Sequence, residues 1–125
     1  MTILTSERKQ EIINEVLLQR KNHNHFLELM KKRQIKVLEI AQRCADFLKS
    51  KYGVTKVVLF GSSLNYKTMN DNSDIDLAVW NLSEKDYFQA IGFLLEIAEY
   101  FTIDLVEIQY AKPYILESIN EGIEL

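Results

Sequence analysis

The sequence predicts an α+β domain with an N-terminal helical extension. Between residues 6 and 52 there is no proline or glycine, and residues that favour helices dominate. After Gly53, short β-branched runs alternate with a helical pattern, which gives the order helix, strand, strand, helix, strand, helix. We therefore assign residues 1–52 to the extension and residues 53–125 to the core of the domain.

The extension holds three apolar patches at helical spacing, within residues 12–17, 26–30 and 35–48. The stretch at residues 19–25 between the first two is polar throughout. A periodic pattern of this length without internal caps is long for one globular helix. Two alternatives therefore stand: a pair of helices that turn at residues 19–25, or one long helix that leaves the core.

The apolar surface of the extension exceeds what a sheet of three or four short strands can cover. We expect it to contact another chain, either a second copy or a substrate protein, unless the helices fold back on each other. Heptad repeats are weak, because Arg20, His23 and Gln34 interrupt them. His23 and His25 are expected to be exposed, since the chain has no further histidine to complete a metal site.

Short β-branched runs at residues 56–60, 75–80 and 101–108 are predicted to be strands. The last three residues, 123–125, are expected to add a short edge strand.

Two helices are predicted in the core. Residues 83–100 carry one apolar face, and Ser83 and Asp86 form an S-x-x-D signal for the start of a helix. Pro113 is well placed as the first residue of a short last helix, which Gly122 ends.

Composition excludes several classes of protein. A hydrophobic fraction of 47% argues against disorder, and a formal net charge of -3 argues against nucleic acid as the main partner. No segment approaches the roughly 20 apolar residues of a membrane span, so we expect a cytoplasmic protein with no membrane partner. The single cysteine, Cys44, rules out an internal disulfide and a thiolate zinc site, and its apolar surroundings predict a buried, inert thiol.

Carboxylates stand in two of the predicted strands. Asp74 and Asp76 open the second strand and must share one face, because side chains two residues apart on a strand point the same way. Asp104 lies in the third strand and can join them if that strand lies beside the second. Such a self-repelling cluster calls for a cation, and Mg²⁺ prefers carboxylate, phosphate and water oxygens.

The turn after the first strand supplies a complementary feature. Gly61 allows the backbone to approach a phosphate closely, and the Ser62 hydroxyl with nearby N–H groups can hold phosphate oxygens. A P-loop is rejected, because Tyr66 stands where its second glycine is required and no apolar helix follows. A lone Asp-x-Asp could also be a structural Asx turn, but Gly61 upstream and Asp104 downstream favour a site.

Together, VVLFGSS and SDIDLAVW resemble the signature of the minimal nucleotidyltransferases of the DNA polymerase β superfamily. The resemblance covers residues 54–125. It implies a polymerase β-like fold with a small mixed sheet, the first two strands as a hairpin and helices on one face. It also implies that the triphosphate is held by Gly61, Ser62, Ser63 and Lys67, and that Asp74, Asp76 and Asp104 are the catalytic and metal-binding residues.

Two departures from the family pattern concern the loop between the first two strands. Its spacer has eleven residues rather than the commoner ten, and Ser63 stands where many relatives have an arginine. Lys67 is the only cation in this loop and is expected to act as a point charge toward phosphate.

The resemblance implies transfer of a nucleoside monophosphate, with AMP from ATP as the leading case, to an acceptor hydroxyl. Two Mg²⁺ or Mn²⁺ ions are expected with the bound nucleotide. Family members of this size pair with a small helical protein of the HEPN type and serve as its antitoxin, which makes such a protein the expected acceptor. The alternative is a catalytically weak nucleotide-binding module that neutralises or regulates a partner by binding.

Overall fold

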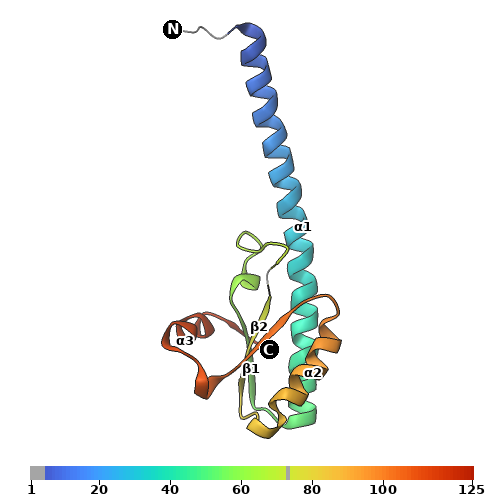
Figure 1. Cartoon of the computed structure of the whole chain (residues 1–125), viewed down its shortest axis with the longest axis vertical. Helices are drawn as coiled ribbons and strands as arrows, with labels where there is room; N and C mark the ends of the chain where they lie inside the picture. The colour runs from blue at the N-terminus through green and yellow to red at the C-terminus, as the bar shows by residue number, and fades with distance from the viewer. Residues whose placement is uncertain (1–4, 73) are drawn as a thin grey trace.

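The computed structural model describes residues 5–72 and 74–125 of the chain. A long helix precedes a compact unit in which four strands and two shorter helices pack together (Figure 1). The helices and strands are α1 (Ser6–Tyr52), β1 (Lys56–Phe60), β2 (Ile75–Trp80), α2 (Tyr87–Ala98), β3 (Ile103–Glu107), α3 (Pro113–Asn120) and β4 (Ile123–Glu124), with short 3-10 turns at Ser62–Leu64, Glu84–Asp86 and Ile108–Tyr110.

The strands form one mixed sheet in the order β3-β2-β1-β4. β1 pairs antiparallel with both β2 and β4, whereas β2 and β3 run parallel. The expected mixed sheet, the antiparallel pairing of the first two strands and the short edge strand are all confirmed.

α1 is a single helix of 47 residues, about 70 Å long at 1.5 Å per residue. Thr5 caps its start by accepting a hydrogen bond from the backbone N–H of Arg8, and Gly53 ends it in the left-handed conformation. The alternative of a helical hairpin is therefore wrong. The polar stretch at residues 19–25 is compatible with a helix, because it contains no glycine or proline to break the backbone pattern.

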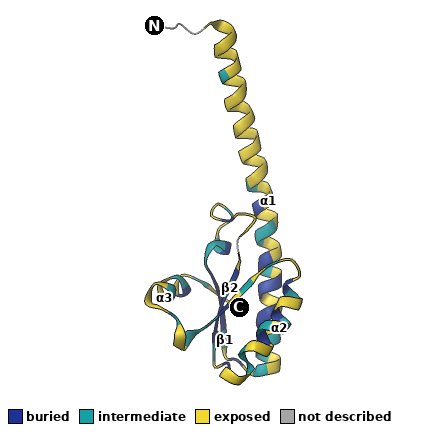
Figure 2. Cartoon of the chain, viewed as in Figure 1, coloured by how far each residue is buried: buried dark blue, intermediate teal, exposed yellow. Residues whose placement is uncertain are grey.

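The two halves of α1 have different surroundings. Residues 6–29 project from the compact unit, and only Ile12 and Leu27 among them are even partly buried (Figures 1 and 2). From Met30 onward the same helix packs into the core through buried side chains, which are Met30, Val37, Ile40, Ala41, Cys44, Ala45 and Leu48. The division into an extension of residues 1–52 and a core of residues 53–125 stays a prediction.

Helices cover both faces of the sheet. α2 and the part of α1 from Met30 onward pack on one face, where Leu59, Leu77 and Leu94 are fully buried. The short α3 packs on the opposite face, where Ile119 meets Val58 and residues of β2. α1 and α2 thus lie on one face as expected, and α3 is an addition on the other.

Two element boundaries differ from the sequence-based expectation. β3 is shorter than the predicted residues 101–108, and α2 begins at Tyr87 only after a 3-10 turn. The side chains of Ser83 and Asp86 accept no capping hydrogen bond from a backbone N–H, so the predicted S-x-x-D cap is wrong. The turn itself satisfies the backbone, since the N–H of Asp86 donates to the carbonyl of Ser83 at 2.9 Å.

Cys44 is fully buried in the core, as expected, and burial raises the pKa of its thiol to about 12. A thiol with this pKa stays protonated and unreactive at neutral pH. In the described part of the chain, no helix is long and apolar enough to cross a membrane.

Candidate active site

The predicted site residues come together at one end of the sheet. Because β1 runs antiparallel to β2 and β3, its carboxyl end lies beside the amino ends of the other two strands. Phe60 pairs with Asp76, and Asp76 pairs with Asp104. The turn at Gly61 and the carboxylates at the starts of β2 and β3 therefore share one edge.

Asp76 and Asp104 are direct register partners on neighbouring strands, so their side chains leave the same face of the sheet. Asp76 shares that face with Ala78, which packs with Phe60 and Ile119 on the α3 side. The carboxylates thus lie on the face opposite to α1 and α2. The expectation that the third strand lies beside the second is confirmed.

Asp76 is electrostatically perturbed. Its partial burial, together with the neighbouring charges of Asp104 and Asp74, raises the pKa of its carboxyl from 3.8 to about 6. Close negative charges in a poorly solvated position favour either a proton or a metal cation.

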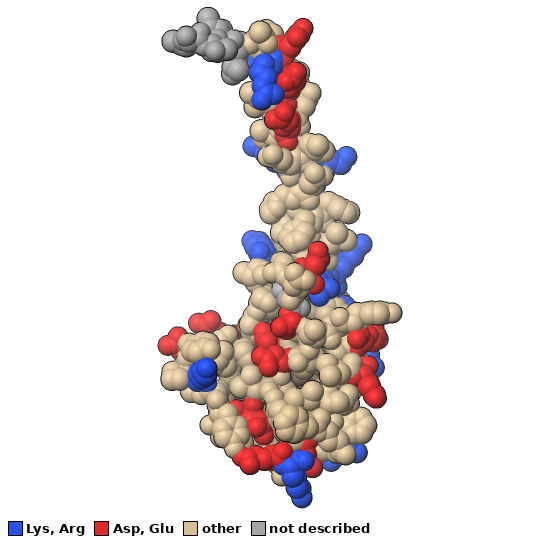
Figure 3. All heavy atoms as spheres, in the orientation of Figure 1, with Lys and Arg blue, Asp and Glu red and all other residues tan. Residues whose placement is uncertain are grey.

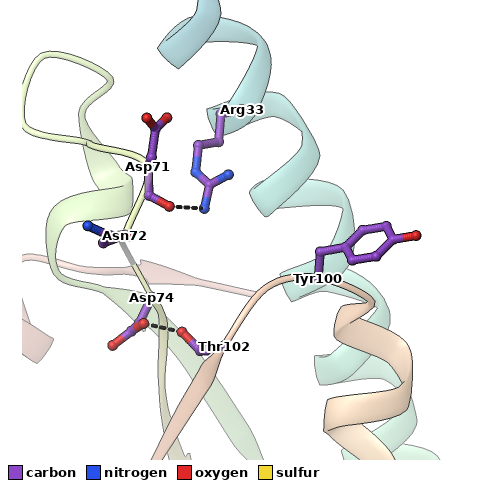
Figure 4. Close-up of a pocket in the computed structure, with 6 residues that line it drawn as sticks. All are labelled: Arg33, Asp71, Asn72, Asp74, Tyr100 and Thr102. Carbon is purple, nitrogen blue, oxygen red and sulfur yellow. Dashed lines mark hydrogen bonds between the residues drawn. The ribbon is translucent and has the colours of Figure 1, made fainter.

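Asp74 lies just before β2 and is exposed, but its carboxylate is held in place. The hydroxyl of Thr102 donates a hydrogen bond to Asp74 Oδ1 (Figure 4). Sequence reasoning missed Thr102, although its position two residues before Asp104 places it on the same strand face. Through Thr102, the start of β3 orients the first carboxylate of β2.

Gly61 lies against Asp76. Its φ of 86° and ψ of -156° belong to a region open almost only to glycine, and an added Cβ would collide with Oδ2 of Asp76. The glycine thus permits two things: the sharp turn after β1 and the close approach of the loop to the central carboxylate.

The other loop residues differ in their surroundings. Ser63 is fully buried, and its hydroxyl donates to the backbone carbonyl of Asp74 at 3.0 Å, which ties the loop to the start of β2. Ser62 is half-buried, and its carbonyl accepts from the Thr68 hydroxyl at 3.0 Å. Lys67 is exposed, and its backbone N–H donates to the side chain of Asn65.

Two residues of α1 also reach this end of the sheet, and sequence reasoning did not include them in the site. Arg33 donates to the backbone carbonyl of Asp71 at 3.1 Å, and Gln34 donates to that of Ser63 at 3.0 Å. The only sequence signal was the interruption of the apolar pattern at Gln34.

A pocket of 230 Å³ opens between α1, the loop before β2 and the start of β3 (Figure 4). Its lining residues are Arg33, Asp71, Asn72, Asp74, Tyr100 and Thr102. In Figure 4 the Arg33 side chain points toward Asp71, whereas the Tyr100 ring points away from the pocket. The pocket gives solvent and ligands access to the edge where Asp74 stands.

The donor set fits magnesium bound together with a nucleotide. Among residues 5–72 and 74–125, no group of three or more His, Cys, Asp or Glu side chains could hold a metal ion by itself. Mg²⁺ is, however, typically bound by one or two carboxylates together with substrate phosphates rather than by an all-protein cage. The paired Asp76 and Asp104, whose mutual repulsion a cation would relieve, match that mode.

Comparisons with known proteins bear on the family and the fold of the chain. The sequence model of a family described as polymerase beta nucleotidyltransferase matches residues 42–125. A crystal structure of a tyrosine-to-alanine mutant of the toxin–antitoxin pair MntA-HpeT is similar with a TM-score of 0.53 and 22% identity, over 67% of this chain and 69% of that one. The structure of a proposed minimal nucleotidyltransferase is similar with a TM-score of 0.51 and 23% identity, over 79% of this chain and 95% of that one. A search of curated proteins found no match.

Proposed function

The chain belongs to the polymerase beta nucleotidyltransferase family, and we propose that it transfers a nucleoside monophosphate, AMP from ATP in the leading case, to an acceptor hydroxyl. One observation carries this proposal most directly. Asp76 and Asp104 are register partners at the sheet edge where Gly61 turns the chain against Asp76. Carboxylates for metal and a glycine turn for phosphate thus stand side by side.

Asp74, Asp76 and Asp104 are the proposed ligands of two Mg²⁺ or Mn²⁺ ions that arrive with the nucleotide. When bound, the ions offset phosphate charge and polarise the reacting phosphoryl group. The same three carboxylates without a cation repel a triphosphate, so nucleotide binding should depend on the metal.

The chain's own residues would position the reactants. The turn at Gly61 and the Ser62 hydroxyl would hold triphosphate oxygens, while Lys67 would add a point charge and Ser63 would fix the loop against β2. Asp104 would orient the acceptor hydroxyl and take its proton as the hydroxyl oxygen attacks the α-phosphorus. The bond from that phosphorus to the pyrophosphate oxygen then breaks, and pyrophosphate leaves.

The acceptor is proposed to be a hydroxyl of a partner protein, with a small helical HEPN-type toxin as the leading candidate. The similarity to a toxin–antitoxin structure supports this choice.

A second candidate is a catalytically weak module that binds nucleotide and regulates a partner by contact. The spacer loop holds no arginine, and Lys67 at its exposed position cannot offer the two-pronged phosphate contact of a guanidinium. This candidate predicts metal-dependent nucleotide binding without transfer.

Isothermal titration with ATP tests the common part of both candidates. We expect binding in Mg²⁺ or Mn²⁺ and its loss in EDTA, because uncompensated carboxylates repel the triphosphate. Equal affinity in EDTA would exclude the proposed metal site.

Incubation with ATP labelled at the α-phosphate and with a co-encoded helical protein then separates the two candidates. Label on that protein from α-labelled but not γ-labelled ATP indicates nucleotidyl transfer. Binding without label indicates the regulatory module.

A further inference from the structure

Two adjacent residues of α1 contact all three segments that carry the proposed site. Gln34 Nε2 donates to the carbonyl of Ser63 in the loop after β1. Arg33 Nη2 donates to the carbonyl of Asp71 before β2, and its guanidinium stacks 4.4 Å from the ring centroid of Phe101 before β3. One turn of helix thus touches the glycine loop and the starts of both carboxylate strands.

Arg33 and Gln34 lie outside the residues that the family model matches, which begin at residue 42. They also lie just after the point where α1 enters the core, between the buried Met30 and the exposed Ile35. Polar side chains there interrupt the apolar stripe of α1, so packing alone does not account for them.

We propose that Arg33 and Gln34 are positioning residues. They hold the loop after β1 and the starts of β2 and β3 in the arrangement that the proposed site requires. This inference rests on the proposed function of the same site. Neither residue is a direct ligand of the metal in this arrangement, because α1 covers the face of the sheet opposite to Asp76 and Asp104. They act through the backbone of the segments they hold.

The chemistry of Arg33 suits this role better than lysine would. A guanidinium is planar, so it can stack on Phe101 and direct a fixed N–H toward Asp71 at the same time. A lysine keeps the charge but loses both the planar stack and the fixed direction. Displacement of reacting groups by about 1 Å can lower a rate by about a hundredfold.

The test uses the full chain with Arg33→Ala, Arg33→Lys and Gln34→Ala. Two matched controls on the same helix remove a cation or an amide that contacts no site segment: Lys32→Ala and Gln42→Ala, the latter bonding only to Asp46. Three quantities are measured for each variant: backbone amide exchange, the Kd for ATP with Mn²⁺, and the melting temperature.

We expect Arg33→Ala to raise amide exchange about tenfold or more at residues 61–64, 74–76 and 102–104, with the core half of α1 unchanged. Gln34→Ala should raise it at residues 61–64 alone. The Kd should rise about tenfold for Arg33→Ala, nearly as much for Arg33→Lys, and not at all for the controls.

Three results would overturn the proposal. If amide exchange at the site segments is the same in Arg33→Ala as in the Lys32→Ala control, Arg33 does not restrain these segments. Full recovery by Arg33→Lys would show that charge alone matters. A uniform rise in exchange with a lower melting temperature would show a general structural role. The exchange measurement needs no ligand, so it decides the inference even if wild-type protein binds no nucleotide and the proposed function fails.

Discussion

At the scale of single residues, the ionised carboxylate of Asp76 lowers the stability of the fold, although the proposed metal site uses that carboxylate. Its half-buried carboxyl has a pKa of about 6 against an ordinary 3.8, because burial and the charges of Asp104 and Asp74 disfavour ionisation. The native state therefore binds this proton more tightly than the unfolded chain does. Its stabilising contribution is complete below about pH 4 and is lost as the pH rises through 6.

We accordingly expect Asp76→Asn to stabilise the metal-free protein at pH 7. One pKa unit corresponds to about 1.4 kcal/mol, and solvent screening of this partly exposed group reduces the gain to about 1–2 kcal/mol. The melting temperature should rise by about 3–12 °C at pH 7. Relative to wild type, this gain should vanish toward pH 4.

The same Asp76→Asn variant should lose metal-dependent ATP binding, because a neutral amide is a poor magnesium ligand. A variant that is less stable than wild type at pH 7 would instead indicate a structural role for this carboxylate.

Gly61 offers a second residue-scale prediction. Gly61→Ala should destabilise the chain by about 2 kcal/mol or more, since its backbone conformation excludes a side chain and the new methyl group meets Asp76. Gly92→Ala is the matched control: it lies in α2 with no atom within 4 Å of an added Cβ and should stabilise by about 0.5–1 kcal/mol. Chemical denaturation measures both. Equal stability of the two variants would contradict the proposed close approach.

At the scale of elements, α1 combines two kinds of helix. Its inner half is buried on the sheet, whereas residues 6–29 are exposed apart from partial burial at Ile12 and Leu27. Most of the stability of a protein helix comes from packing of an apolar face rather than from intrinsic propensity. The outer half therefore depends on the stability of an almost isolated helix.

Amide exchange should show this difference directly. In a dilute, monomeric sample we expect low protection over residues 6–29 and a steep rise past Met30, where burial begins. Uniform protection from residue 6 to residue 52 in the monomer would show that the outer half of α1 is stable without another chain packed against it.

At the scale of the whole molecule, the projecting half of α1 carries an apolar surface without a partner within the chain. Its exposed large apolar side chains are Ile13, Val16, Leu17, Leu18, Phe26 and Leu29. Residues 6–19 hold three glutamates and two cations, whereas cations predominate over residues 20–33. Figure 3 shows charged side chains at both ends of this half and an uncharged stretch between them, which includes residues 22–27.

This distribution favours an antiparallel pair formed with a second copy of the chain, because each acidic end then meets a basic segment. Sedimentation should show a dimer of the full chain and a monomer of the Leu17→Glu, Leu18→Glu double variant, with the melting of the compact unit unchanged.

Gln109→Glu with Asn120→Glu adds the same charge at exposed positions outside α1 and should leave the dimer intact. A wild-type monomer at all concentrations would contradict self-pairing and leave the outer helix free for a different protein.

Local patterns in the sequence predicted most of the helices and strands and the shared strand face of Asp74 and Asp76. β-branched runs predicted the strands, and the two-residue spacing of Asp74 and Asp76 placed both carboxylates on one face, because strand geometry is set by neighbouring residues. The apolar surroundings of Cys44 likewise predicted its burial. The catalytic, metal-binding and nucleotide-binding roles of these residues stay predictions.

Tertiary structure decided what depends on distant parts of the chain. The pairing of Asp104 with Asp76 follows from the parallel placement of β3 beside β2, and the contact of Arg33 with Asp71 follows from the path of α1 across the sheet. The choice between a hairpin and one long helix also lay outside local propensity, since both use helical residues throughout. Such contacts join residues far apart in the sequence, and their free energy comes from the packing of the whole domain rather than from any local pattern.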